Sequence, residues 1–150
     1  MVTGFENREA WAPPAWSRVT RSFGNPGRPN AMAVLVVDDE ESVRASVADV
    51  IRTVGYTVIE ASDGHDALRF LTTMRFNAMV LDLHMPRLGG IAMLSALSKP
   101  PPVVVLSGYE LDEEDRREFG QAIVTHLRKP VPPEMLLDVL ADAVGLQRQP

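Results

Sequence analysis

The chain has 150 residues, 20 acidic and 15 basic side chains, a formal net charge of −5 and no cysteine. This length suits about one domain, and the lack of cysteine excludes a disulfide framework and thiolate chemistry. No apolar stretch approaches the length of a membrane span, and the amino terminus lacks the pattern of a secretory signal. We therefore expect a cytoplasmic protein with no membrane partner and, without a basic stripe, no direct contact with nucleic acid.

Residues 1–31 differ in composition from the rest of the chain. Prolines and glycines interrupt any hydrophobic period there, as in the run Gly24-Asn25-Pro26-Gly27, and arginine outnumbers glutamate. Segments of this kind bury too little apolar surface to fold alone. We predict a disordered amino-terminal extension over residues 1–31 and one folded domain over residues 32–147, with Trp11 and Trp16 leaving open a docking role for the extension.

From Met32 onward, short apolar runs alternate with segments of helical period. Apolar runs that are continuous rather than alternating indicate strands covered on both faces. The predicted strands are Ala33–Val37, Tyr56–Glu60, Ala78–Leu81, Val103–Leu106 and Ile123–Leu127.

Five helices are predicted between and after these strands. They are a first helix with an apolar stripe from Val43 to Val54 and a left-handed cap at Gly55, a second that starts at Asp63-Gly64 and continues through Leu71, a third from Gly89-Gly90 through Leu97, a fourth around Leu111 to Phe119, and a fifth that follows Pro132-Pro133 through Val144. Strict alternation with short connections forces parallel pairing and right-handed crossovers. The fold class is therefore α/β, a doubly wound five-stranded parallel sheet in a three-layer αβα sandwich.

Polar residues follow four of the predicted strands at the point where each strand ends. They are Asp38, Asp39, Asp82, Ser107 and Lys129. An open parallel sheet builds its site at the carboxyl ends of its strands, so these side chains are expected to converge. Three carboxylates, a hydroxyl and an ammonium group in one place suit a hard metal ion and a phosphoryl group.

Four motifs in this order carry a specific resemblance. They are Val36-Val37-Asp38-Asp39-Glu40, then Leu81-Asp82-Leu83-His84-Met85-Pro86 with Gly90 after it, then Leu106-Ser107-Gly108, and last Arg128-Lys129-Pro130. Together they resemble the receiver domain of two-component response regulators, over roughly Ala33 to Gly145. The resemblance implies the flavodoxin-like receiver fold and a single-domain response regulator that works in a phosphorelay.

By this resemblance, Asp82 is the phosphoacceptor, which takes a phosphoryl group from a histidine kinase or a phosphotransfer protein. A carboxylate is a weak nucleophile, so it needs an activated donor and neutralisation of charge on the transferred group. The resemblance implies Mg²⁺ held by Asp39, Asp82 and the backbone carbonyl of His84, with Asp38 reaching the ion through water. Magnesium prefers oxygen ligands and keeps several of its waters.

The resemblance also assigns a switch. Lys129 pairs with the acceptor carboxylate and then with a phosphoryl oxygen, the Ser107 hydroxyl turns inward to the phosphoryl group, and Pro130 follows a cis peptide bond. His126 stands where the family usually has Tyr or Phe, and imidazole is smaller and more polar than either ring. It is interpreted as a half-buried strand residue that contributes less to the switch than an aromatic residue would.

The implied protein catalyses only its own phosphorylation and dephosphorylation and signals by protein contacts with a downstream target. A weak homodimer through the fourth helix, fifth strand and fifth helix is a further expectation. Two alternatives are a phosphorylation-independent interaction module and a phosphatase of the haloacid-dehalogenase type, although the latter needs a second aspartate where His84 stands. A flavodoxin-like cofactor binder is disfavoured, because the acidic run Asp38-Asp39-Glu40-Glu41 would repel a phosphate at the first strand.

Overall fold

The structure is a computed structural model that describes residues 32–83, 85, 88–108 and 110–146. The predicted extension at residues 1–31, the end of the predicted domain at residue 147 and His84 lie outside the described residues. Strands and helices alternate strictly along the described chain. The strands are β1 (Ala33–Val37), β2 (Thr57–Ala61), β3 (Ala78–Leu81), β4 (Val103–Ser107) and β5 (Ile123–Arg128). The helices are α1 (Glu41–Arg52), α2 (Gly64–Thr73), α3 (Gly90–Ser95), α4 (Glu113–Phe119) and α5 (Pro133–Leu146).

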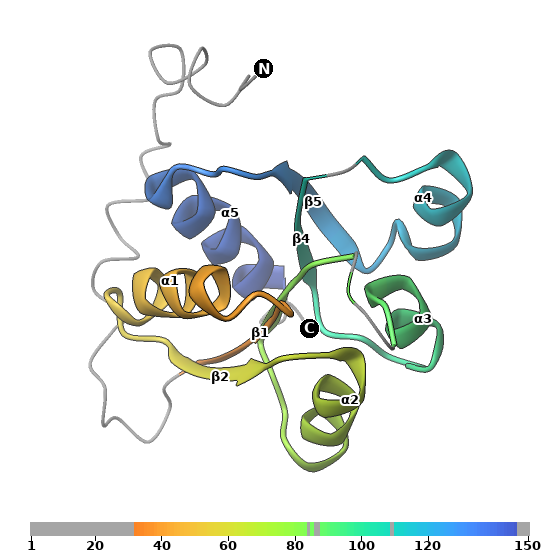
Figure 1. The fold of residues 1–150 in the computed structure, drawn as a ribbon, viewed down its shortest axis with the longest axis horizontal. Helices are drawn as coiled ribbons and strands as arrows, with labels where there is room; N and C mark the ends of the chain where they lie inside the picture. The colour runs from red at the N-terminus through yellow and green to blue at the C-terminus, as the bar shows by residue number, and fades with distance from the viewer. Residues whose placement is uncertain (1–31, 84, 86–87, 109, 147–150) are drawn as a thin grey trace.

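All strand pairs are parallel, and the order in the sheet is β2-β1-β3-β4-β5. Helices α1 and α5 cover one face of the sheet, and α2, α3 and α4 cover the other (Figure 1). The predicted doubly wound three-layer sandwich is confirmed. The strand order reverses between β1 and β3, and a crevice forms at the carboxyl ends of the strands at such a point. Among the described residues, no helix combines the length and apolarity that crossing a bilayer requires.

Two hydrophobic cores lie on opposite faces of the sheet. Leu35, Val37 and Leu81 face α2, α3 and α4, whereas Val34 and Val36 face α1 and α5. Successive residues of a strand point to opposite faces of the sheet. Because helices cover both faces, the side chains on both faces of β1 are apolar. This packing explains why the sequence of the central strands is continuously apolar rather than alternating.

The end of the first helix differs from the sequence prediction. The apolar stripe extends to Val54, but α1 ends at Arg52 with Thr53 as its cap. The backbone N–H of Gly55 donates to the carbonyl of Arg52 at 2.9 Å, and Gly55 has a φ of 91°. The predicted left-handed glycine is therefore confirmed, and the tight turn around it removes Val54 from the helix.

The third helix and the fourth strand also end at other residues than predicted. Helix α3 stops at Ser95 because the N–H of Leu97 donates to the carbonyl of Leu94, a tighter bond than the α-helical one. Strand β4 includes Ser107, which pairs with Arg128 of β5. The hydroxyl residue therefore belongs to the strand, where backbone pairing fixes its position.

The start of α3 packs directly on the backbone that follows β3. The N–H of Gly90 donates to the carbonyl of Leu83 at 3.1 Å. A Cβ atom at Gly90 would lie 2.6 Å from the carbonyl oxygen of Asp82 and 2.9 Å from Cα of Leu83. Only glycine permits this approach, so residue 90 fixes how closely the helix supports the strand end at Asp82.

We predict that Gly90→Ala lowers the free energy of unfolding by about 1–3 kcal/mol, because the added methyl group collides with backbone that cannot move aside. The matched control is Gly145→Ala in α5, where a Cβ meets nothing within 4 Å. The control should leave the free energy unchanged or raise it by at most about 1 kcal/mol. Urea denaturation of both variants provides the measurement, and equal stability of the two would contradict the packing argument.

Candidate functional site

Three carboxylates meet at the carboxyl ends of β1 and β3. Oxygen atoms of Asp38, Asp39 and Asp82 all lie within 4.8 Å of one another. The strands are locked together at this point, since the N–H of Asp82 donates to the carbonyl of Val37 at 2.9 Å. Asp38 and Asp82 are buried, whereas Asp39 is exposed. The sheet thus brings together the acidic residues that the sequence predicted to converge.

Hydrogen bonds hold Asp38 on several sides. Its N–H donates to the carbonyl of Ala61, and its Oδ1 accepts from the N–H of Glu40 at 2.9 Å. Its Oδ2 accepts from Nζ of Lys129 at 2.7 Å. A buried carboxylate needs such partners to offset its lost hydration. Asp38 is therefore fixed in one orientation before any ligand arrives.

Lys129 supplies the positive charge of the cluster. Its Nζ lies 2.7 Å from Oδ2 of Asp38 and 3.5 Å from Oδ2 of Asp82. Burial lowers the pKa of Lys129, but the hydrogen bond and charge of Asp38, together with the charge of Asp82, outweigh burial and leave the pKa above its usual value. The resemblance implies Asp82 as the partner of Lys129, but Asp38 is the closer of the two carboxylates in the structure.

The end of β5 is tied to the end of β4 beside the acidic cluster. The N–H of Lys129 donates to the carbonyl of Ser107 at 3.1 Å, and the peptide bond between Lys129 and Pro130 is cis. Ser107 is fully buried at the last position of β4. His126 is a half-buried residue of β5 that pairs with Val105. Ser107 thus lies at the same edge of the sheet as the carboxylates, and His126 lies further back along β5.

The donor set is chemically uniform, because all three clustered residues offer carboxylate oxygens. Oxygen ligands of this kind suit Mg²⁺, which is usually held by one or two carboxylates together with waters and phosphate oxygens. The exposed carboxylate of Asp39 leaves one side of the cluster open to solvent. The residues therefore fit a hard divalent cation.

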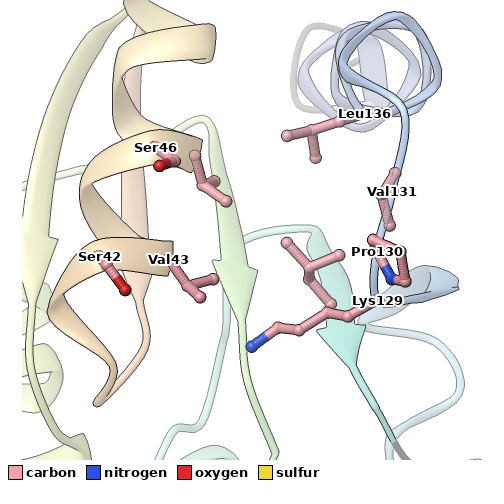
Figure 2. A pocket seen from close by; sticks show the side chains of 9 residues that line it. Ser42, Val43, Ser46, Lys129, Pro130, Val131 and Leu136 are labelled. Carbon is pink, nitrogen blue, oxygen red and sulfur yellow. The ribbon is translucent and has the colours of Figure 1, made fainter.

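A groove next to the cluster was not anticipated from the sequence. It has a volume of about 580 Å³ and lies between α1 and the segment that joins β5 to α5. Figure 2 shows Val43 of α1 and Leu136 of α5 on opposite sides of the groove. The lining residues are Ser42, Val43, Ser46, Val47, Leu106, Lys129, Pro130, Val131 and Leu136. Lys129 belongs to both places, so the groove adjoins the acidic site.

Comparison with known sequences gives a consistent result. A family model described as the response regulator receiver domain matches residues 34–141. Response regulator RR06 of Streptococcus pneumoniae is 36% identical over 101 residues, which make up 66% of this chain and 46% of that protein. The transcriptional regulatory protein PrrA of Mycobacterium bovis is 46% identical over 77 residues, covering 49% of this chain and 33% of that one. The chain spans less than half the length of these curated relatives.

Solved structures with the same fold include chemotaxis response regulator CheY4 of Vibrio cholerae. It is 30% identical, with a TM-score of 0.66 over 76% of this chain and 99% of that chain. A CheY-like receiver domain protein from Methanospirillum hungatei has a TM-score of 0.71 over 79% of this chain and 97% of that chain. At 24% identity, the second likeness concerns the fold alone.

We predict that Lys129 and Asp38 are energetically coupled in metal-free buffer. Lys129→Met should lower the free energy of unfolding by about 1–3 kcal/mol, because the Asp38 carboxylate, whose side chain is 5% exposed, loses its counter-charge. Adding Asp38→Asn should restore part of this loss, since a neutral amide needs no counter-charge. A double-mutant cycle by urea denaturation measures the coupling, and effects that add to within about 0.5 kcal/mol would contradict it.

Proposed function

The chain belongs to the family of response regulator receiver domains, and from this premise we propose that Asp82 accepts a phosphoryl group from a phosphohistidine. The donor is a histidine kinase or a phosphotransfer protein. The observation that carries the proposal is the position of Asp82, buried at the end of β3 among two other carboxylates and 3.5 Å from Lys129. Burial and a cation at the acceptor are what an in-line transfer to a weak nucleophile requires.

In the proposed step, a carboxylate oxygen of Asp82 attacks phosphorus and forms the new O–P bond. The N–P bond of the donor breaks, and its electron pair returns to the imidazole nitrogen. The ammonium group of Lys129 is close enough to Asp82 to donate to an oxygen of the transferred group. Lys129 then exchanges a carboxylate partner for a phosphoryl partner, and its interaction with Asp38 keeps the ammonium group in place meanwhile.

We propose that Mg²⁺ is held by Asp39 and Asp82, with Asp38 contributing through a water molecule. The backbone carbonyl of His84 is the further ligand that the family implies. The ion would neutralise charge on the phosphoryl oxygens as the transfer proceeds. This chain's contribution is to hold the carboxylates within 4.8 Å of one another before the ion binds.

Signal output is proposed to begin at Ser107 and Lys129. A phosphoryl group adds about −1.5 to −2 charges and recruits nearby donors. Ser107 is joined to Lys129 by a backbone hydrogen bond, so movement of either residue affects both β4 and β5. His126, on β5, is proposed to respond less than an aromatic residue would, because imidazole gains less by burial. The affected surface is α4, β5 and α5, where a downstream protein or a second copy of the chain would bind.

We propose that the donor protein docks over the groove between α1 and α5. The groove shares Lys129 with the phosphoacceptor site, so a partner seated there brings its histidine close to Asp82. Its walls are largely apolar, with Val43, Val131 and Leu136 among them, and therefore suit an apolar side chain on the donor. A small acyl phosphate needs no such surface. Comparing the two donors therefore separates the effect of a substitution on docking from its effect on phosphoryl transfer.

The competing function is an interaction module that works without phosphorylation. Such a module would not need a half-buried cation between two carboxylates beside a solvent-facing third, and this arrangement favours the phosphoacceptor. On this basis we propose that the chain is a signalling domain that catalyses only its own phosphorylation and dephosphorylation.

We predict that acetyl phosphate adds one phosphoryl group to the protein in the presence of Mg²⁺, and that none is added in excess chelator. Asp82→Asn should abolish the adduct, whereas Asp66→Asn, at a half-buried residue of α2 outside the acidic cluster, should leave it unchanged. Intact-mass spectrometry measures the adduct directly. An adduct of equal yield on the Asp82 variant would show that another residue is the acceptor.

We also predict that Ser46→Glu slows phosphoryl transfer from an autophosphorylated histidine kinase by about tenfold, or about 1.4 kcal/mol, because it places a charge in the docking groove. The kinase is the member of a purified panel that phosphorylates the wild type fastest. Labelling by acetyl phosphate should be unchanged. Ser95→Glu, the same substitution at an exposed serine of α3 on the other face, is the control. Equal rates for both variants would place docking elsewhere.

A further inference from the structure

The positively charged side chain of Arg44, on α1, contacts the backbone of the acidic site. The NH1 group of Arg44 donates to the carbonyl oxygen of Asp38 at 2.9 Å. The same guanidinium group faces β2, where its Nε lies 3.5 Å from Oε1 of Glu60. The Arg44 side chain is only 16% exposed, so most of it is removed from solvent.

The carbonyl that Arg44 contacts belongs to the peptide unit that joins Asp38 to Asp39. A peptide unit is planar, so fixing the direction of this C=O group also fixes the N–H and Cα positions of Asp39. The other atoms of Asp38 are already held by Ala61, Glu40 and Lys129. Arg44 therefore adds a constraint on the backbone that carries the exposed carboxylate of Asp39.

Glu60 in turn holds Arg44 in place. It is the parallel-register partner of Val36, two residues before Asp38, so it is fixed to β1 by the sheet itself. Its second oxygen faces Arg52, whose NH2 lies 3.2 Å from Oε2 of Glu60. Arg52 is more exposed, at 44%, and contacts the carbonyl of Val58 rather than any residue of the acidic cluster.

We infer that Arg44 is a positioning residue that orients Asp39 for the divalent cation by anchoring the Asp38 carbonyl to Glu60. This inference rests on the proposed metal site. A planar guanidinium group can donate to the carbonyl with one nitrogen and to the carboxylate with another, which a methionine of similar length cannot. Outer groups that orient metal ligands typically change metal affinity by 10- to 100-fold when they are removed.

The test compares Arg44→Met with Arg52→Met. Both variants remove one arginine from α1, and each removes one of the two cations at Glu60, but only the first removes the contact with Asp38. Mg²⁺ is titrated into the metal-free, unphosphorylated protein and followed by backbone amide NMR shifts. We expect Arg44→Met to weaken Mg²⁺ binding by about tenfold and Arg52→Met to bind like the wild type. Equal affinities of the two variants overturn the inference.

A measurement on the wild type keeps the inference testable if Arg44→Met does not fold. The Nε–H signal of Arg44 should shift with Mg²⁺ at the same apparent affinity as the amide of Asp39, and the Nε–H signal of Arg52 should not move. If the Arg44 signal does not shift when Mg²⁺ is added, the inference is overturned. If the wild type itself binds no Mg²⁺, the proposed metal site fails and the inference falls with it. If the wild type binds Mg²⁺ and accepts phosphate while Arg44→Met matches it, the inference alone fails.

Discussion

The constraint on which the site depends is the crowding of three carboxylates at the reversal of strand order. Two like charges about 4 Å apart repel by roughly 4 kcal/mol at an effective dielectric near 20, so such a cluster persists only with compensation nearby. Lys129 supplies it from the end of β5, 2.7 Å from Asp38 and 3.5 Å from Asp82. The same cation reduces the repulsion that the carboxylates would exert on a negatively charged phosphoryl group. Charge balance and chemistry therefore depend on one ammonium group.

Each acidic residue has a different support. Asp38 is buried and held by three neighbouring segments of chain, and Asp82 rests on a strand end that α3 supports through Gly90. Asp39 is exposed, and its peptide unit is held through Arg44 and Glu60. This division suits a site that must be preorganised on one side and open to a cation and a donor on the other.

Helix α1 has two relations to the site. Its inward side, through Arg44, contacts the loop that carries the carboxylates. A second side of α1 forms one wall of the groove that shares Lys129 with the site. A donor protein bound over this groove would therefore contact the helix that also positions Asp39, so docking and readiness for transfer are joined in one element.

Much of this was determined by the sequence alone. Continuous apolar runs ending in Asp38, Asp82 and Ser107 predicted both the parallel sheet and the edge at which its polar residues meet, because strand ends in a parallel sheet share one side. Helix ends were less predictable, since apolar periodicity continues through Val54 and Leu97 whereas turn hydrogen bonds end the helices earlier. The tertiary structure alone decided the rest. The preference of Lys129 for Asp38, the contact of Arg44 with a carbonyl on the preceding loop, and the groove between α1 and α5 all depend on distances between side chains from separate segments. Such distances cannot be read from the order of the residues, because they are set only when the chain packs.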